Sequence, residues 1–269
     1  MACAALSGDH ELVRSLVTAK AAMDTSAPGM PEVFNVPDLT PLHLATFFRS
    51  HDLEVLETLL QLGADPNSST INAPTPLSHC STAASVDLLV RYGAEVNCQG
   101  DVLSQFCPIH LVCAMSAPGE VLLRLLELRA DVSGGHGGLA TGSRLQNVAF
   151  SGDSENDFRN AELLLESRAD INQVCQPQGV MRSLELMARA ISACTFGEES
   201  KMLKWFSNLS TTPLGWCALF DNEGLLVFLL SKGADPEIRN NRGLRPIDMA
   251  SSERIREILR QEELITEAL

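Results

Sequence analysis

The sequence has few aromatic residues, no excess of basic charge and no long apolar run, and each shortage excludes a class of protein. Aromatic side chains make up 5% of the 269 residues. The chain has 20 lysines and arginines against 34 aspartates and glutamates, a formal net charge of −14. This disfavours nucleic acids and anionic membranes as partners, because both attract basic surfaces. No apolar run reaches the roughly 18 residues of a membrane-spanning helix. We therefore expect no membrane insertion, and a basic protein would complement the charge.

The N-terminus and the cysteines carry no mark of secretion. The first residues lack a basic segment followed by an apolar one, so no signal peptide is predicted. The eight cysteines are scattered along the chain instead of forming a compact disulfide framework. This pattern favours free thiols in a reducing compartment. We expect a cytoplasmic protein, and a nuclear location fits the same observations.

The strongest local signal is a helix start that is followed by a helix stop. Residues 38–45 read Asp-Leu-Thr-Pro-Leu-His-Leu-Ala, in which Thr40 suits an N-cap and Pro41 the first helical position. Residues 59–67 end in Gly-Ala-Asp-Pro-Asn. Gly63 suits the residue after a helix, which needs a positive φ, and Asp-Pro-Asn then turns the chain. The two signals leave room between them for two short helices packed back to back.

At these residues the chain resembles the ankyrin repeat, a unit of about 33 residues with a Thr-Pro-Leu-His-x-Ala signature. The resemblance implies an all-α solenoid of stacked helix–turn–helix units joined by β-hairpin finger loops. It extends over the whole chain as one domain, 1–269. The predicted units are 1–37 (a truncated N-terminal repeat), 38–71, 72–106, 107–141, 142–172, 173–210 (degenerate), 211–242 and 243–269 (a C-terminal cap).

Two of these units depart from the pattern. In the repeat at 107–141, Arg129 stands where the helix stop normally has glycine. Further along, 65 residues separate Ala169 from Ala234, the alanines of two successive Gly-Ala-Asp positions, which is close to two units. A degenerate repeat is therefore expected in 173–210, with the apolar residues Leu184, Leu186, Met187, Ala190 and Ile191 on its first helix. A helical insertion that is no repeat is the alternative.

Few residues of the sequence suggest catalysis or metal binding. Cys107, His110 and Cys113 have a spacing that suits metal ligands, but a fourth ligand is missing and His110 falls on the histidine of the repeat signature. In the family this histidine bonds to neighbouring turns, so a structural role is expected. His79 and Cys80 are adjacent, but neighbours on a helix point about 100° apart, so they are not expected to act as a catalytic pair. We predict no catalytic residue, no metal site and no cofactor.

The resemblance implies a non-catalytic scaffold or adaptor that binds a protein on the concave face of the stack. The expected binding residues are Phe47, Phe48, Arg49, Met115, Leu219, Phe220 and Asp221. In some ankyrin proteins the asparagine that closes the Gly-Ala-Asp motif is hydroxylated, which makes Asn67, Asn97 and Asn172 candidates for modification. The protein partner is expected to be basic, and the chain itself a monomer. The alternative is a regulatory ankyrin region of a larger enzyme or membrane protein, present here as a fragment.

Overall fold

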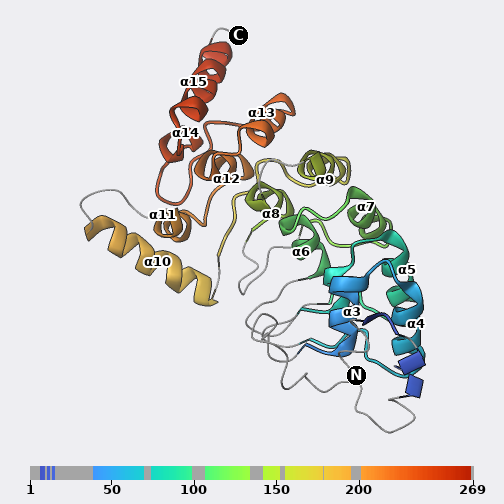
Figure 1. Ribbon diagram of the computed structural model, residues 1–269. Helices are drawn as coiled ribbons and strands as arrows, with labels where there is room; N and C mark the ends of the chain where they lie inside the picture. The colour runs from blue at the N-terminus through green and yellow to red at the C-terminus, as the bar shows by residue number, and fades with distance from the viewer. Residues whose placement is uncertain are drawn as a thin grey trace. The chain divides into compact units, whose positions relative to one another are not determined.

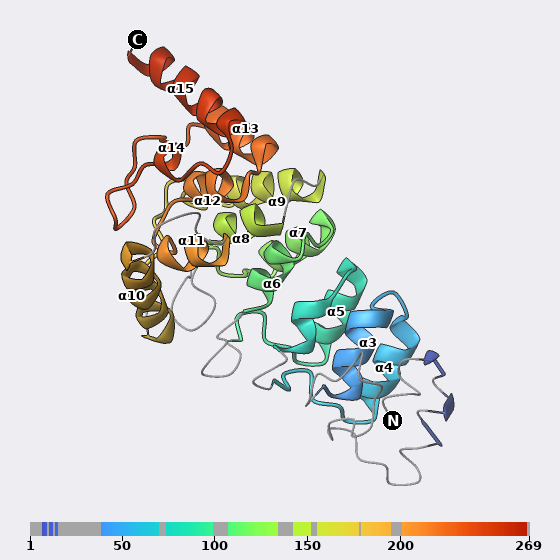
Figure 2. The same cartoon turned by 60° about the vertical axis from the view of Figure 1, so that its left-hand side comes forward.

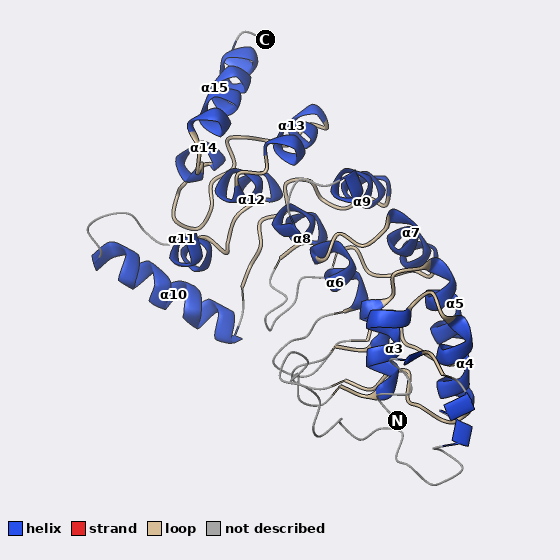
Figure 3. Cartoon of the chain, in the orientation of Figure 1, coloured by secondary structure: helices blue, strands red, loops and turns tan. Residues whose placement is uncertain are grey.

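The computed structural model describes residues 7–9, 11–12, 14–15, 39–69, 74–98, 107–133, 142–151, 155–177, 179–194 and 201–267. Over these residues the chain is helical and has no strand (Figure 3). The all-α prediction is therefore confirmed, whereas much of the expected finger loops lies outside the described residues. The chain divides into two compact units, Met1–Val112 with Ala117–Asp131, and Cys113–Ser116 with Val132–Leu269.

The first unit is built from short helices in sequential pairs (Figure 1). They are α3 (Pro41–Arg49), α4 (Leu53–Gln61), the 3-10 helix η2 (Pro76–His79), α5 (Ala83–Arg91), α7 (Gly119–Glu127) and the first residues of α6 (Pro108–Ala114). Helix α3 packs on α4 and on η2, while α4 packs on α5 and α5 on α7. Inner and outer helices thus each stack on their counterparts in the next pair.

The start and stop signals read from the sequence are present in this unit. Thr40 caps α3: its Oγ1 accepts from the backbone N–H of His43 at 3.4 Å, and its own N–H donates to His43 Nδ1 at 3.3 Å. Gly63 ends the second helix with φ 93°. The N–H of Ala64 then donates back to the carbonyl of Leu59 at 3.0 Å, closing the helix end as left-handed glycine caps do.

The second unit contains the remaining helices (Figure 2). They are α8 (Arg144–Ser151), α9 (Glu155–Glu166), α10 (Gly179–Cys194), α11 (Lys201–Ser207), α12 (Pro213–Phe220), α13 (Glu223–Ser231), α14 (Pro246–Met249) and α15 (Glu253–Glu267). Helix α12 packs on α13 and α14, and α14 packs on α15. This end of the chain therefore continues the pairwise stacking.

Helices α10 and α11 do not take part in this pairwise stacking. Helix α8 packs directly on α12, and α9 on α13, although α10 and α11 lie between them in sequence. Helix α10 packs mainly on α11, and Figures 1 and 2 both show this pair at the margin of the unit. A repeat within the stack would separate α8 from α12. The arrangement favours an insertion over the degenerate repeat expected at 173–210.

Two arginines occupy positions where the repeat normally has glycine. Arg129 has φ 63° and Arg168 has φ 65°, while Gly93 and Gly233 hold the same place with φ 95° and 89°. The left-handed backbone is kept even where the side chain disfavours it. Because this conformation costs an L-residue about 1–2 kcal/mol, the stacking of neighbouring loops must outweigh a local penalty at both arginines.

Candidate functional site

Two neighbouring phenylalanines lie exposed at the end of α3. The first part of this helix, from Pro41 to Thr46, is buried, whereas Phe47 and Phe48 are 49% and 41% exposed. Their rings meet edge to face, with centroids 4.8 Å apart. The ring of Phe47 also meets the ring of His79 at 5.4 Å. Three rings from α3 and η2 thus form a cluster, which we call the Phe47 cluster (Phe47, Phe48 and His79).

His79 is a neutral member of this cluster. Burial, and secondarily the nearby His43, lower the pKa of His79 to about 4. The two histidine rings lie 6.4 Å apart. Nδ1 of His79 is buried and has no hydrogen-bond partner among the described residues. At neutral pH the cluster therefore presents uncharged aromatic surface. In the sequence His79 stands out only as the neighbour of Cys80. Its contact with Phe47 could not be predicted, because the two residues belong to successive repeats and meet only when these repeats stack.

The other predicted binding residues behave differently. Arg49 is half-buried, and its guanidinium donates to the carbonyl of Ser7 at 3.0 Å. In the second unit, Met115 is exposed. Leu219 is buried in the core, so the expectation that its side chain faces a groove is corrected: α12 is covered by α8, α13 and α14.

The residues after Leu219 form a helix end. Phe220 is half-buried, and its ring meets that of Trp216 at 5.8 Å. Asp221 is exposed and has φ 64°, and its carboxylate accepts a hydrogen bond from the hydroxyl of Ser252. Asp221 thus joins α12 to the start of α15. The seven predicted residues are divided between the two units, and the Phe47 cluster is the part that the structure assembles.

The three candidate asparagines link successive loops. Nδ2 of Asn67 donates to the carbonyl of Gly93 at 2.8 Å, and its Oδ1 accepts from the N–H of Glu95 at 2.8 Å. One side chain therefore satisfies a donor and an acceptor of the next loop. Such side-chain bonds to backbone are typical of turns.

The same contact recurs one loop later. Nδ2 of Asn97 donates to the carbonyl of Arg129 at 3.1 Å, and Oδ1 accepts from the N–H of Asp131 at 2.9 Å. In the second unit, Oδ1 of Asn172 accepts from the N–H of Asp235 at 2.9 Å. These contacts give the asparagines a structural role, and their hydroxylation stays a prediction.

The histidines of the repeat signature also bond to backbone. His43 Nδ1 accepts from Thr40, so Nε2 carries the proton and donates to the carbonyl of Pro74 at 2.9 Å. His110 Nδ1 accepts from the N–H of Cys107 at 3.1 Å. Burial raises the pKa of the Cys113 thiol to about 12. Among the described residues, no three His, Cys, Asp or Glu side chains gather as a metal site would require.

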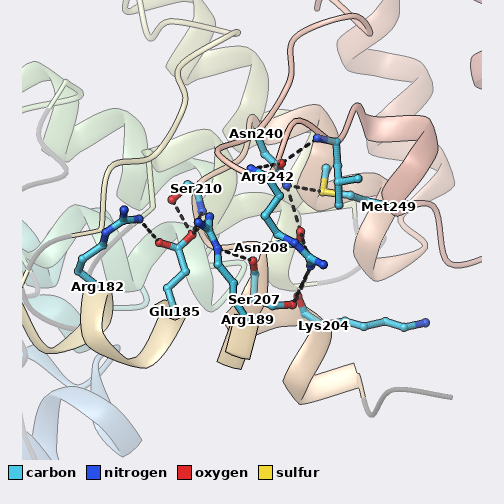
Figure 4. A network of polar contacts seen from close by, with 11 residues as sticks. Arg182, Glu185, Arg189, Lys204, Ser207, Asn208, Ser210, Asn240, Arg242 and Met249 are labelled. Carbon is cyan, nitrogen blue, oxygen red and sulfur yellow. Dashed lines mark hydrogen bonds and ion pairs between the residues drawn. The ribbon is translucent and has the colours of Figure 1, made fainter. Parts of the chain in front are cut away.

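A buried carboxylate anchors the excursion formed by α10 and α11, and sequence reasoning missed it (Figure 4). The Glu185 side chain is fully buried. Its carboxylate accepts hydrogen bonds from Arg182 Nη1 at 2.6 Å and from Arg189 Nη2 at 2.8 Å. Ser210 adds its hydroxyl at 2.6 Å and its backbone N–H at 3.2 Å. The spacing Arg-x-x-Glu-x-x-x-Arg was the available signal, because residues three and four apart share a helix face.

A second set of polar contacts ties the end of α11 to the loop between α13 and α14. Asn240 Nδ2 donates to Asn208 Oδ1 at 3.0 Å. Arg242 Nη1 donates to Ser207 Oγ at 3.3 Å and to Asn208 Oδ1 at 3.4 Å. Figure 4 shows the two asparagines facing one another beside the Arg242 guanidinium. The excursion is thus fastened at its C-terminal end to the loop that precedes α14.

Comparison with known proteins identifies the repeats. The family model for the ankyrin repeat matches residues 38–71 and 211–241. The chain is an ankyrin-repeat protein. An ankyrin and IPT/TIG repeat-containing protein of Schizosaccharomyces pombe is 40% identical over 53 residues, which are 20% of this chain and 5% of that protein. The ankyrin-repeat chain therefore matches only a small part of this relative.

Solved ankyrin structures share the fold over nearly the whole length. The human ASB11 ankyrin repeat domain superimposes with a TM-score of 0.68 and 20% identity, over 97% of this chain and 96% of that one. The ankyrin repeat domain of Bcl-3, a member of the IkappaB protein family, gives a TM-score of 0.59 and 18% identity, over 96% of each chain. At these identities the likeness establishes the fold alone. Ankyrin repeats are in general protein–protein interaction modules and typically non-enzymatic. No described helix is long and apolar enough to cross a membrane.

Proposed function

We propose that this ankyrin-repeat protein is a non-catalytic scaffold that binds a protein partner, and that the Phe47 cluster on its concave face is part of the binding surface. The observation that carries the proposal is the exposure of Phe47 and Phe48 side by side at the end of a helix that is otherwise buried. Large aromatic side chains supply much of the binding energy at protein interfaces. Their exposure on the inner helix of a repeat fits a contact surface.

The cluster is also preorganised. The Phe47 ring contacts both the Phe48 ring and the His79 ring, so binding would immobilise few additional rotamers. Ordering a free side chain on association costs about 0.5–1.5 kcal/mol. A surface already fixed by ring contacts avoids part of that cost, which supports a role in recognition.

The charge of the chain supports a basic partner. Its formal net charge is −14, and the low pKa of His79 keeps this ring from adding positive charge at the cluster. An arginine or lysine of the partner over an exposed phenylalanine face would gain a cation–π contact of about 0.5–1 kcal/mol. Long-range electrostatic attraction would also increase the association rate, and added salt would weaken this effect.

Affinity capture tests this proposal. The complete chain and its Phe47→Ala/Phe48→Ala variant serve as baits, with mass spectrometry of the bound proteins and titration of a recovered partner. Leu123→Ala is the matched control, because Leu123 is a similarly exposed apolar residue of α7. We expect the double variant to bind at least about tenfold more weakly, which corresponds to about 1.4 kcal/mol, and the control to bind as the unchanged protein does. Equal loss in variant and control, or no loss in either, contradicts the assignment.

A second candidate function is a regulatory ankyrin region within a larger enzyme or membrane protein. The observation that favours it is the relative from Schizosaccharomyces pombe, of which the matched segment is 5%. Ankyrin repeats there belong to a much longer chain. Genomic sequence on both sides of this coding region distinguishes the two, since a continuous reading frame into another domain is required only by the second.

A further inference from the structure

Helix α10 exposes three large apolar side chains. Among its described residues Met181, Glu185 and Ala188 are buried, whereas Leu186, Met187 and Ile191 are 50%, 55% and 45% exposed. The apolar residues expected to pack in the core thus face outward, and a carboxylate faces inward. Half-exposed apolar side chains are common singly, but several on one helix face indicate an interaction surface.

The exposed residues form one continuous face of the helix. Ser183 and Ala190 are exposed as well, and the positions i, i+3, i+4, i+7 and i+8 of an α-helix share one side. We call this face the α10 stripe (Ser183, Leu186, Met187, Ala190 and Ile191). It has no charged residue, and its i, i+3, i+4, i+7 spacing is the pattern with which one helix packs against another.

The polar contacts of Glu185, which lies on the opposite face, hold the stripe outward. Arg182 and Arg189 both bond to Glu185, at 2.6 and 2.8 Å, and Ser210 completes the set at 2.6 Å. Rotating α10 to bury its apolar residues would break both hydrogen bonds from Ser210 to the buried Glu185 carboxylate and the bond from Arg189 Nε to the carbonyl of Ser207 at 3.3 Å. The stripe is therefore a fixed feature of the unit.

We propose that the α10 stripe is a docking site for an amphipathic helix of another protein whose apolar face is bordered by acidic residues. The acidic border follows from the arginines. Arg182 and Arg189 lie seven residues apart, on the same edge of the stripe, next to Leu186. They share one carboxylate, so one positive charge is left over on this edge, and the Arg182 side chain is 42% exposed.

The neighbouring helix α11 also carries positive charge. Helix α11 contributes Lys204. Among the described side chains of the two helices, Arg182, Arg189 and Lys204 outweigh Glu185, within a chain whose formal charge is −14. Charge complementarity across an interface mainly sets which partner is accepted, and here it selects an acidic helix, in contrast to the basic partner proposed for the Phe47 cluster.

The size and charge of the surface argue against a second copy of this chain as the occupant. A standard interface buries about 800 Å² on each partner, far more than three half-exposed side chains can provide. Two copies would also each bring a formal charge of −14, and would place the same basic edge against itself. A single helix lying along the stripe requires only a few apolar anchors.

Two synthetic peptides test the proposal on the complete chain. Each is an alanine-based helix of about five turns, with leucines at i, i+3, i+4 and i+7. One carries glutamates along both borders of the leucine face, and the other carries lysines at the same positions. Fluorescence anisotropy of the labelled peptides measures their affinity at low and at moderate salt.

We expect the glutamate peptide to bind, and the lysine peptide to bind at least about tenfold more weakly at low salt, with the gap narrowing as salt screens the charges. In Leu186→Gln/Met187→Gln, affinity for the glutamate peptide falls at least about tenfold. Val227→Gln is the matched control, because Val227 is a 47% exposed apolar residue on α13 of the same unit. This control keeps the affinity of the unchanged protein.

Three results overturn the proposal: neither peptide binds, both bind alike, or the control loses as much affinity as the double variant. Sedimentation velocity tests whether a second copy of this chain occupies the stripe instead. A concentration-dependent dimer that Leu186→Gln/Met187→Gln abolishes would assign the stripe to self-association and would also overturn the proposal. Retained thermal stability of the variant shows that it folds. The proposal does not depend on the Phe47 cluster, and Phe47→Ala/Phe48→Ala is expected to bind the glutamate peptide normally.

Discussion

Asn172 accepts a hydrogen bond from the backbone N–H of Asp235 at 2.9 Å, although the two residues lie 63 positions apart. The equivalent bonds of Asn67 to Glu95 and of Asn97 to Asp131 span 28 and 34 positions. The asparagine contact therefore passes over α10 and α11 and joins the loops that stack directly. Helical packing agrees, since α8 contacts α12.

Removal of the excursion should leave the stack intact. The N–H of Cys175 donates to the carbonyl of Thr211 at 3.1 Å, so the chain enters and leaves the excursion at adjacent points. We expect the protein with 179–207 replaced by a short Gly/Ser linker to keep a cooperative unfolding transition and its α8–α12 packing. Circular dichroism and urea denaturation measure both properties.

Deletion of a pair within the stack is the control for this excision. Without 144–166, which contain α8 and α9, the α12–α13 pair loses the neighbour on which it packs. Stability of a repeat array resides largely in such interfaces. The control should lose cooperative unfolding of the second unit. Similar loss in both deletions would mean that α10 and α11 are an integral repeat after all.

The local signals of the fold could be predicted because they depend on residues close in sequence. Thr40 and Pro41 start a helix, and Gly63 ends one, through bonds to their own neighbours. The orientation of α10 could not be predicted in the same way. Apolar periodicity locates the face with Leu186 and Ile191 correctly but assumes that this face is buried. Its exposure depends partly on Ser210, which lies 25 positions from Glu185.

The candidate site was predictable to a similar degree. The repeat pattern placed Phe47 and Phe48 at the end of an inner helix, where they are indeed exposed. The same rule placed Leu219 on the surface, but three helices cover α12 there. Spacing within a repeat identifies which positions are equivalent, whereas burial depends on what the neighbouring units bring against each one.

Glycine at the two left-handed arginines should stabilise the protein. Arg129 and Arg168 have φ 63° and 65°, and glycine adopts such angles without the steric penalty of a Cβ. We expect Arg129→Gly and Arg168→Gly each to raise the free energy of unfolding by about 1 kcal/mol, measured by urea denaturation. Gly63→Ala is the reverse control: a Cβ there meets nothing within 4 Å, so its expected loss of about 1 kcal/mol comes from the backbone alone.

Acid should destabilise the protein through His79. The pKa of this residue is lowered from 6.5 to about 4, mainly by burial. The unfolded chain therefore takes up the proton first as pH falls, and the stabilisation present above pH 6.5 is lost progressively toward pH 4. At 1.36 kcal/mol per unit, the full effect is about 3 kcal/mol.

The variant His79→Gln isolates that contribution. Between about pH 7.5 and pH 4, its free energy of unfolding should fall by about 3 kcal/mol less than that of the unchanged protein. Carboxylates elsewhere contribute equally to both and cancel in the difference. Parallel pH dependences in the two proteins would show that His79 titrates normally in the folded state.

The buried thiols should be unreactive in the folded protein. Burial raises the pKa of Cys80 and of Cys113 to about 12, so at pH 8 only about one molecule in ten thousand has the reactive thiolate. The pKa of Cys98 is also raised, but this side chain is partly exposed. With iodoacetamide under native conditions, we expect Cys98 to be alkylated well before Cys80 and Cys113, and all three to react at similar rates in urea. Mass spectrometry of tryptic peptides follows each site. Native alkylation of Cys113 as fast as that of Cys98 would reveal an activated thiol and reopen the case for chemistry between Cys107 and Cys113.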